Sequence, residues 1–172
     1  VELGCLISED AAKKVEEQVN STIDLGATLV TGGKRKGAFY DITILDNVTK
    51  NMPVAKDMEI FGPVISIIGF DDIEEAIEIA NQSSFGLCGC IISKDMNNAL
   101  KVANRLDVGG AIINGASFFR SFEMPFGGWK HSGLGNEGVM STLHEMSRRM
   151  SIILMNILLI NLKIIQNYQA MK

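Results

Sequence analysis

The alternation of apolar runs and helix starts between residues 64 and 113 constrains the fold of this chain most strongly. A nearly continuous β-branched run covers residues 64–70, and shorter apolar runs cover residues 87–93 and 111–113. Aspartates suited to cap a helix precede the two intervening stretches, in which apolar residues recur at helical spacing. This order implies right-handed crossovers, so the sequence predicts an α/β fold with a largely parallel sheet. The first run is typical of a strand that is buried on both faces.

The residues on either side of this alternation add further elements. Ser8 and the acidic residues after it open a predicted amphipathic helix. Short strands are expected at residues 28–31 and within residues 39–48. A last helix is expected near residues 137–145, after an irregular stretch that is rich in glycine and aromatic residues.

The end of the chain differs in texture from the rest. Residues 151–165 are mostly apolar, but two asparagines and a lysine interrupt them, so they fall short of the ~20 apolar residues that a spanning helix needs. We therefore expect residues 1–150 to form one domain segment. Residues 151–172 are expected to hold an oligomerisation-type strand followed by an apolar tail, with no membrane span.

Composition narrows the class of protein. The 172 residues suffice for one domain or a large piece of one, and 47% hydrophobic with 21% charged residues exclude intrinsic disorder. Twenty acidic against 16 basic side chains give a net charge of -4, which argues against a nucleic-acid partner. Three cysteines are too few for a disulfide framework, which favours a reduced, cytoplasmic compartment. No signal peptide is visible, and the missing initiator Met suggests a piece of a longer protein.

The loop before the first apolar run holds a carboxylate and an aromatic ring two residues apart. In extended backbone Glu59 and Phe61 point the same way. A carboxylate can accept two hydrogen bonds from a vicinal diol such as a ribose, while the ring packs against an adjacent base. The alternative is a surface glutamate and a core phenylalanine beside a Gly-Pro turn, and the spacing alone favours that alternative.

Two other features invite a chemical interpretation. Residues 124–138 contain five glycines ahead of a helix, a loop able to approach a ligand closely, although a purely structural loop explains the pattern better. Cys88 and Cys90 share one strand face without a nearby pair of histidines, which predicts small buried side chains and no metal site. No Ser-His-Asp arrangement is visible, so the sequence predicts no catalytic residue.

Taken together, the two loops resemble the aldehyde dehydrogenase superfamily. The resemblance covers roughly residues 6–153 and rests on four motifs in the family's order and spacing. These motifs are Glu59-Ile60-Phe61-Gly62-Pro63-Val64, the run from Asn81 to Phe85-Gly86-Leu87, Asn114, and Pro125-Phe126-Gly127-Gly128-Trp129-Lys130-His131-Ser132-Gly133. The matching part of the family is the C-terminal part of its catalytic domain, which has a three-layer α/β topology with helices on both faces of the sheet.

The resemblance implies roles for individual residues. Glu59 would bind the ribose hydroxyls of NAD or NADP, and Phe61 would pack beside the nicotinamide. Asn114 and Phe126 would lie near the aldehyde pocket. The family's catalytic Cys lies farther upstream than this chain reaches, and Cys5 falls where the family has Pro.

The loop after residue 113 bears on the substrate. Phe119 and Arg120 belong to a stretch that lines the aldehyde entrance in the family, and Arg120 is the only cation between Arg105 and Lys130. Its planar fork suits a carboxylate or phosphate. Relatives that take anionic aldehydes, such as succinate-semialdehyde, lactaldehyde-type or glyceraldehyde-phosphate enzymes, have Arg in a similar loop. The alternative is a solvated or structurally paired arginine.

We therefore identify the chain as resembling the C-terminal segment of an NAD(P)-dependent aldehyde dehydrogenase. The complete enzyme would oxidise a small aldehyde to a carboxylate through a Cys thioester, as a dimer or tetramer. This segment would lack the nucleophile and be inactive alone. The alternative is a truncated, non-catalytic module that self-associates or binds a partner. A Gly-x-Cys motif encoded in frame upstream of Val1 would distinguish the two.

Overall fold

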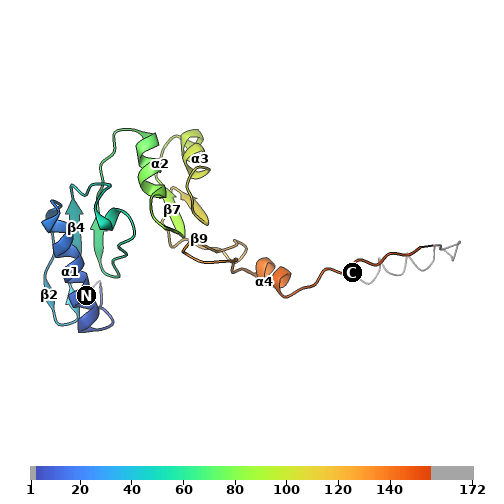
Figure 1. The fold of residues 1–172 in the computed structure, drawn as a ribbon, viewed down its shortest axis with the longest axis horizontal. Coiled ribbons are helices and arrows are strands. Elements are labelled where there is room, and N and C mark those ends of the chain that lie inside the picture. Colours follow the sequence, from blue (N-terminus) through green and yellow to red (C-terminus); the bar gives the residue numbers. More distant parts are fainter. Residues whose placement is uncertain (1–2, 156–172) are drawn as a thin grey trace.

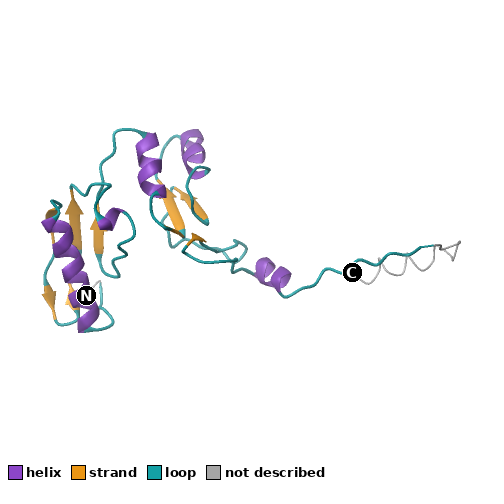
Figure 2. Ribbon diagram, in the orientation of Figure 1, coloured by secondary structure: helices purple, strands orange, loops and turns teal. Residues whose placement is uncertain are grey.

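The computed structural model describes residues 3–155, which form two groups of elements and an extended segment (Figure 1; Figure 2). We call these groups the first and the second lobe. The first lobe holds α1 (Glu9–Asp24), β1 (Thr28–Thr31), β2 (Arg35–Lys36), β3 (Phe39–Tyr40), β4 (Thr43–Asp46), the 3-10 turn η1 (Pro53–Ala55) and β5 (Val64–Ser66). The second lobe holds α2 (Ile73–Asn81), β6 (Phe85–Gly86), β7 (Cys88–Ile91), α3 (Met96–Ala103), β8 (Gly110–Ile113) and β9 (Trp129–Lys130), and α4 (Val139–Glu145) follows it.

The core of the first lobe lies between α1 and the sheet. The Ser8 side chain accepts a hydrogen bond from the backbone of Ala11 and so caps α1, as the sequence predicts. Val15 and Val19, one helical turn apart, are buried against Leu45 of β4. The helix expected after Ser8 and the strand expected at residues 28–31 are both confirmed.

The strand expected at residues 64–70 is shorter and more exposed than predicted. Only Val64–Ser66 forms β5, which pairs in parallel with β4 at the edge of the sheet β1-β4-β5. Ile65 is 57% exposed, so the prediction of a strand buried on both faces is wrong for this structure. No element among residues 3–155 buries Ile65. A β-branched run indicates that a strand is suited to burial, but it does not show that another element is there to bury it.

The second lobe contains the other parallel pair. β7 and β8 pair in parallel, and α3 connects them in the chain. β6 and β9 form an antiparallel pair. Asp72 and Asp95 are the N-cap residues that precede α2 and α3, and their carboxylates accept hydrogen bonds from backbone N–H groups of the first turn, as the sequence predicts. The strand arrangement differs from the expected one: β5 and β7 belong to different sheets, and the described strands form three antiparallel pairs beside the two parallel ones, so they do not form one largely parallel sheet.

The chain leaves the second lobe through α4 and an extended segment (Figure 1). Residues 151–155 are exposed and form no strand, and residues 156–172 lie outside the described residues. The predicted oligomerisation strand needs a second chain to pair with, so it stays a prediction. Among the described helices, none has the length and apolar character to cross a bilayer.

Candidate functional site

The Glu59 loop connects η1 to β5 and passes close to α1. The Gln18 side chain of α1 donates to the backbone carbonyl of Glu59 at 3.3 Å, while the Glu59 carboxylate is exposed. Glu59 lies at the edge of an open pocket of about 440 Å³, which we call the Glu59 pocket. Its other lining residues are Ala80, Phe85, Gly86, Leu87, Cys88, Val108, His131 and Ser132.

The aromatic partner predicted for Glu59, Phe61, is not among the residues that line this pocket. Phe61 is 76% exposed, so the alternative of a core phenylalanine is wrong for this structure. A ring that is this exposed offers most of its surface to a planar ligand.

A second pocket, which we call the Arg120 pocket, brings three of the predicted substrate residues together. Phe119, Arg120 and Phe126 line its volume of about 350 Å³. The guanidinium carbon of Arg120 lies 3.2 Å from the centre of the Phe126 ring, a cation–π contact. A guanidinium nitrogen lies 3.9 Å from the Glu137 carboxylate, too far for a hydrogen bond. The arginine therefore stacks on the ring and forms a long ion pair with Glu137 that leaves its N–H donors without a hydrogen bond to that carboxylate.

The fourth predicted substrate residue has a different environment. The Asn114 side chain accepts from the Ser93 backbone N–H at 2.8 Å and donates to the Ser93 carbonyl at 2.9 Å. Its φ of 56° is a left-handed conformation that asparagine tolerates better than most residues. Asn114 thus extends the pairing of β7 and β8 by one residue, and it is not among the residues that line the Arg120 pocket.

Close backbone approach positions the glycine-rich loop on this pocket. A β-carbon on Gly109, immediately before β8, would overlap the carbonyl oxygen of Gly127. Both residues line the Arg120 pocket. The glycines therefore let the loop pack directly against β8, which supports the structural interpretation of the loop and still leaves it at a pocket wall.

The cysteines do not resemble an activated nucleophile. Cys5 and Cys90 are exposed, and Cys88 is partly buried where the two pockets adjoin, so the prediction of a buried side chain is wrong for Cys90. Burial raises the pKa of the Cys88 thiol, and the neighbouring Cys90 adds to the increase, so the thiolate is disfavoured. Within residues 3–155 no three His, Cys, Asp or Glu side chains cluster in a way that could hold a metal ion.

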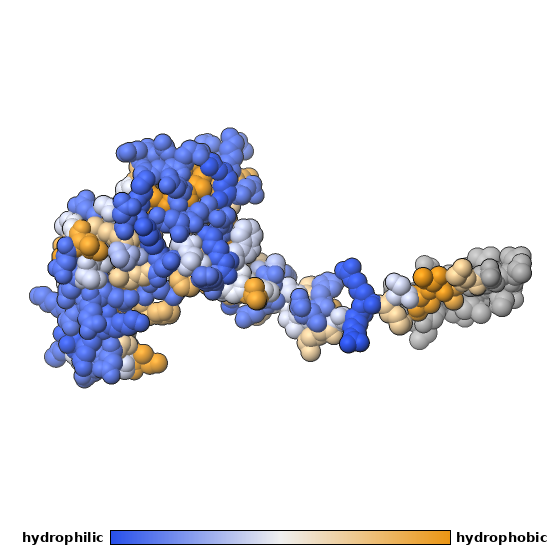
Figure 3. Space-filling model, in the orientation of Figure 1, coloured by the Kyte–Doolittle hydropathy of each residue, from blue (hydrophilic) through white to orange (hydrophobic). Residues whose placement is uncertain are grey.

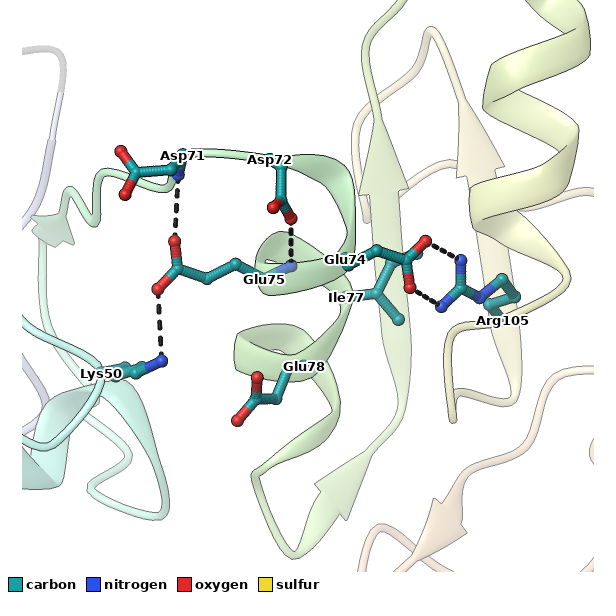
Figure 4. A pocket seen from close by; sticks show the side chains of 8 residues that line it. All are labelled: Lys50, Asp71, Asp72, Glu74, Glu75, Ile77, Glu78 and Arg105. Carbon is teal, nitrogen blue, oxygen red and sulfur yellow. Dashed lines mark hydrogen bonds and ion pairs between the residues drawn. The ribbon is translucent and has the colours of Figure 1, made fainter.

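A charged pocket along α2 is occupied by its own ion pairs (Figure 4). The Glu75 carboxylate accepts from the Asp71 backbone at 3.0 Å and pairs with Lys50 at 3.2 Å. Glu74 accepts two hydrogen bonds from Arg105, two residues after α3. These pairs join α2 to the first lobe and to the turn after α3. The hydrogen bonds from Arg105 lower the pKa of Glu74, and the Asp71 backbone N–H, followed by Lys50, lowers the pKa of Glu75. The cluster is explained as a structural one.

Three charged residues near the two pockets were not singled out by the sequence analysis. Asp57 accepts a hydrogen bond from Ser83, just after α2, and Lys130 donates one to the last carbonyl of α2. Glu137 forms an ion pair with Arg120. Asp57 lies two residues before Glu59, and Lys130 belongs to the glycine-rich motif, so both lie in loops that the sequence analysis had considered as candidate ligand-binding loops. Their partners are distant in the chain, which is why no local pattern revealed them.

The described residues thus place an exposed carboxylate at the edge of one pocket and an arginine over an aromatic ring in another. Residues 1–152 match the model of the aldehyde dehydrogenase family, and the chain belongs to that family. The resemblance drawn from the motifs is thereby confirmed.

Individual relatives support the family and the fold. The chain is 42% identical over 151 residues to the lactaldehyde dehydrogenase of Methanococcus aeolicus, covering 88% of this chain and 32% of that protein. It is 41% identical over 153 residues to the 3-sulfolactaldehyde dehydrogenase of Priestia aryabhattai, covering 89% and 32%. The glyceraldehyde-3-phosphate dehydrogenase GapN of Methanocaldococcus jannaschii, solved with NADP, superposes with a TM-score of 0.79 at 46% identity, covering 84% of this chain and 31% of that one.

These comparisons confirm the predicted fold class, an incomplete α/β domain like the aldehyde dehydrogenase catalytic domain. The chain spans about a third of the length of each of these relatives. The roles of Glu59, Phe61, Asn114, Phe119, Arg120 and Phe126 remain predictions.

Proposed function

We propose that this chain is the C-terminal segment of an NAD(P)-dependent aldehyde dehydrogenase and supplies part of its cofactor and aldehyde sites. The observation that carries the proposal is the exposure of both Glu59 and Phe61, two residues apart in one loop, with Glu59 at the edge of an open pocket. The complete enzyme oxidises an aldehyde to a carboxylate through a Cys thioester, and the nucleophile comes from outside this chain. The enzyme is cytoplasmic and works as a dimer or tetramer.

The residues present fit the nicotinamide half of the cofactor. Glu59 can accept hydrogen bonds from both ribose hydroxyls, because no other side chain of the described residues is hydrogen-bonded to its carboxylate. Phe61 offers an uncovered ring on which the planar nicotinamide can pack. The bound cofactor supplies the hydride acceptor. Since NAD and NADP share this half, Glu59 and Phe61 serve either one.

Glu59→Gln in the complete enzyme tests this assignment. The substitution keeps the shape but weakens charge-assisted hydrogen bonds to the ribose, each worth roughly 1.5–3 kcal/mol. The nicotinamide is then held less firmly, so kcat falls about 10-fold or more, while overall cofactor affinity falls less because the adenosine half is bound elsewhere. Steady-state kinetics and cofactor titration measure the two effects.

Glu17→Gln is the matched control for this experiment, since Glu17 is an exposed glutamate on α1. It should leave kcat and cofactor affinity unchanged. A Glu59→Gln enzyme that matches the control in both quantities would show that Glu59 does not bind the ribose.

The environment of Arg120 favours an anionic aldehyde as the substrate. The guanidinium is stacked on Phe126 and lines a mostly apolar pocket that also holds the Glu137 carboxylate 3.9 Å away; a substrate carboxylate, phosphate or sulfonate can compete with Glu137 for two parallel hydrogen bonds. Two relatives are named for aldehydes with a sulfonate or a phosphate group. Another is named for lactaldehyde, which is neutral, so the alternative of a structurally paired arginine remains to be tested.

Arg120→Met in the complete enzyme separates these alternatives. The KM for an anionic aldehyde should rise by at least ~10-fold, which corresponds to ~1.4 kcal/mol. A neutral aldehyde of equal length should be almost unaffected, because its contacts with the pocket walls are retained. Equal losses on both substrates would identify Arg120 as a structural residue that stacks on Phe126.

The second candidate function is a non-catalytic module that self-associates or binds a partner. The observation in its favour is the exposed apolar surface of the described residues, such as Phe118 at 86% and Phe122 at 89%. An assay of the 172-residue chain with NAD or NADP and a panel of aldehydes should show no formation of reduced nicotinamide under either proposal. Turnover that disappears on mutation of Cys88 would contradict both.

A further inference from the structure

The segment between α2 and β7 is hydrogen-bonded to two other parts of the chain. It runs from Asn81, the last residue of α2, through two serines to the short strand β6. On one side it contacts the loop that carries Glu59, and on the other side it contacts the glycine-rich motif at β9. We call residues 81–86 the linking segment.

Lys130 holds the linking segment from the β9 side. Its ammonium group donates to the Asn81 carbonyl at 2.8 Å and to the Ser83 carbonyl at 3.0 Å, and it lies 3.6 Å from the Asp107 carboxylate. Carbonyls at a helix C-terminus lack intrahelical partners and carry the negative end of the helix dipole, so a cation there is favourable. The side chain is only 26% exposed, which limits its screening by water.

The backbone of Lys130 is adapted to this task. Its φ of 54° is left-handed, a conformation that costs energy for a residue with a β-carbon. The adjacent backbone continues the grip, since the His131 N–H donates to the Ser84 carbonyl at 2.9 Å. Ser132 accepts from the Gly86 N–H at 2.9 Å. Consecutive residues of the motif thus bind consecutive parts of the linking segment.

Asp57 receives the linking segment on the opposite side. One oxygen of its carboxylate accepts from the Ser84 N–H at 2.7 Å and from the Ser83 hydroxyl at 3.0 Å. The Gln82 side chain adds a bond to the Ala55 carbonyl at 2.7 Å. Because Asp57 stands two residues before Glu59, the position of the linking segment sets the position of the Glu59 loop.

We propose that Lys130 is a positioning residue for the Glu59 loop: it holds the end of α2 and the Ser83 carbonyl so that Ser83 and Ser84 present their donors to Asp57. The contact between Lys130 and the linking segment lies within this chain and does not depend on any enzyme function. The consequence for the reaction rests on the proposed function of Glu59. The two parts can be tested separately.

Hydrogen exchange in the full 172-residue chain tests the first part. Lys130→Met keeps the side-chain length but removes the charge and the donors, so the Ser84 amide, which binds Asp57, should exchange about 10-fold faster or more. The Val15 amide in α1 should keep its protection. Lys130→Arg retains a cation with donors and should preserve the protection of Ser84, while Lys94→Met, at an exposed lysine before α3, is the matched control.

Other outcomes overturn the first part. Unchanged exchange at Ser84 in Lys130→Met would show that the ammonium does not hold the linking segment. An equal acceleration in α1 would show a general loss of stability. If Lys130→Met fails to fold, Lys130→Arg decides: retained protection of Ser84 supports the proposal, and lost protection contradicts it.

Kinetics of the complete enzyme test the second part. Lys130→Met should lower kcat and raise the primary deuterium isotope effect with a deuterated aldehyde, leaving the KM for the aldehyde within about twofold. A merely structural residue would lower the fraction of active enzyme without changing the isotope effect, and that result would contradict positioning. If Lys130→Met loosens Ser84 while Glu59→Gln has no kinetic effect, the ribose function fails but the grip of Lys130 stands.

Discussion

Tyr40 has a buried hydroxyl group that makes no hydrogen bond within the described residues. The residue is only 6% exposed in the core of the first lobe, and its hydroxyl has no hydrogen-bond partner among residues 3–155. Burial raises the pKa of this hydroxyl, and the nearby carboxylates of Glu16 and Asp41 add to the increase. A buried hydroxyl without a partner loses its hydrogen bonds to water and gains none in return.

Tyr40→Phe should therefore raise the free energy of unfolding by about 1 kcal/mol, because it removes the hydroxyl and keeps the ring. Urea unfolding of the two chains under identical conditions measures the difference. Tyr40→Ala is the comparison for the ring itself and should cost about 3–5 kcal/mol. A Tyr40→Phe chain that is less stable than the original would show that the hydroxyl has a partner after all.

At the scale of elements, α2 depends on its N-terminal cap. The Asp72 carboxylate accepts from the Glu75 N–H at 2.9 Å, while the ion pairs of Glu74 and Glu75 connect the helix to its surroundings (Figure 4). Asp72→Ala leaves a backbone donor of the first turn without a partner and should lower the free energy of unfolding by about 1 kcal/mol. Thermal unfolding followed by circular dichroism measures this loss.

Asp72→Asn provides the control for the cap, since an asparagine side chain accepts the same hydrogen bond. It should retain most of the stability. If Asp72→Asn and Asp72→Ala lose equal stability, the loss comes from charge near the helix dipole and the capping bond is unimportant.

The whole molecule exposes apolar surface in several places. Figure 3 shows such surface on the second lobe and on the extended segment before the residues drawn in grey. Ile65 on the edge strand β5, Ile92 after β7 and Ile153 in the extended segment are 57%, 77% and 79% exposed. Contiguous exposed apolar surface and an uncovered strand edge both promote association.

The 172-residue chain should therefore self-associate at micromolar concentration, as measured by size-exclusion chromatography with light scattering. Ile65→Lys places a charge on the edge strand and should reduce association, because a charged edge opposes strand pairing. Ile7→Lys changes an equally apolar but isolated residue, 97% exposed before α1, and should have no effect. A stable monomer at micromolar concentration would contradict this prediction.

Local patterns in the sequence were sufficient to predict most elements. The caps at Ser8, Asp72 and Asp95 act on donors only three residues away, so the helix starts can be predicted from neighbouring residues alone. The family was predictable for a related reason, since its motifs are short runs of residues in a fixed order. The spacing of Glu59 and Phe61 suggested a possible binding pair, and the family motif around them implied their roles.

Contacts between distant residues were not encoded in any local pattern. β5 pairs with β4 because those two edges meet in space, and the β-branched run of residues 64–70 is equally compatible with other partners. Arg120 stacks on Phe126 and not on the phenylalanines beside it in sequence, and Lys130 reaches carbonyls almost 50 residues away in the chain. Hydrophobic periodicity and capping depend on residues within one or two helical turns, whereas the partners of a strand edge or a long charged side chain depend on how the whole chain packs.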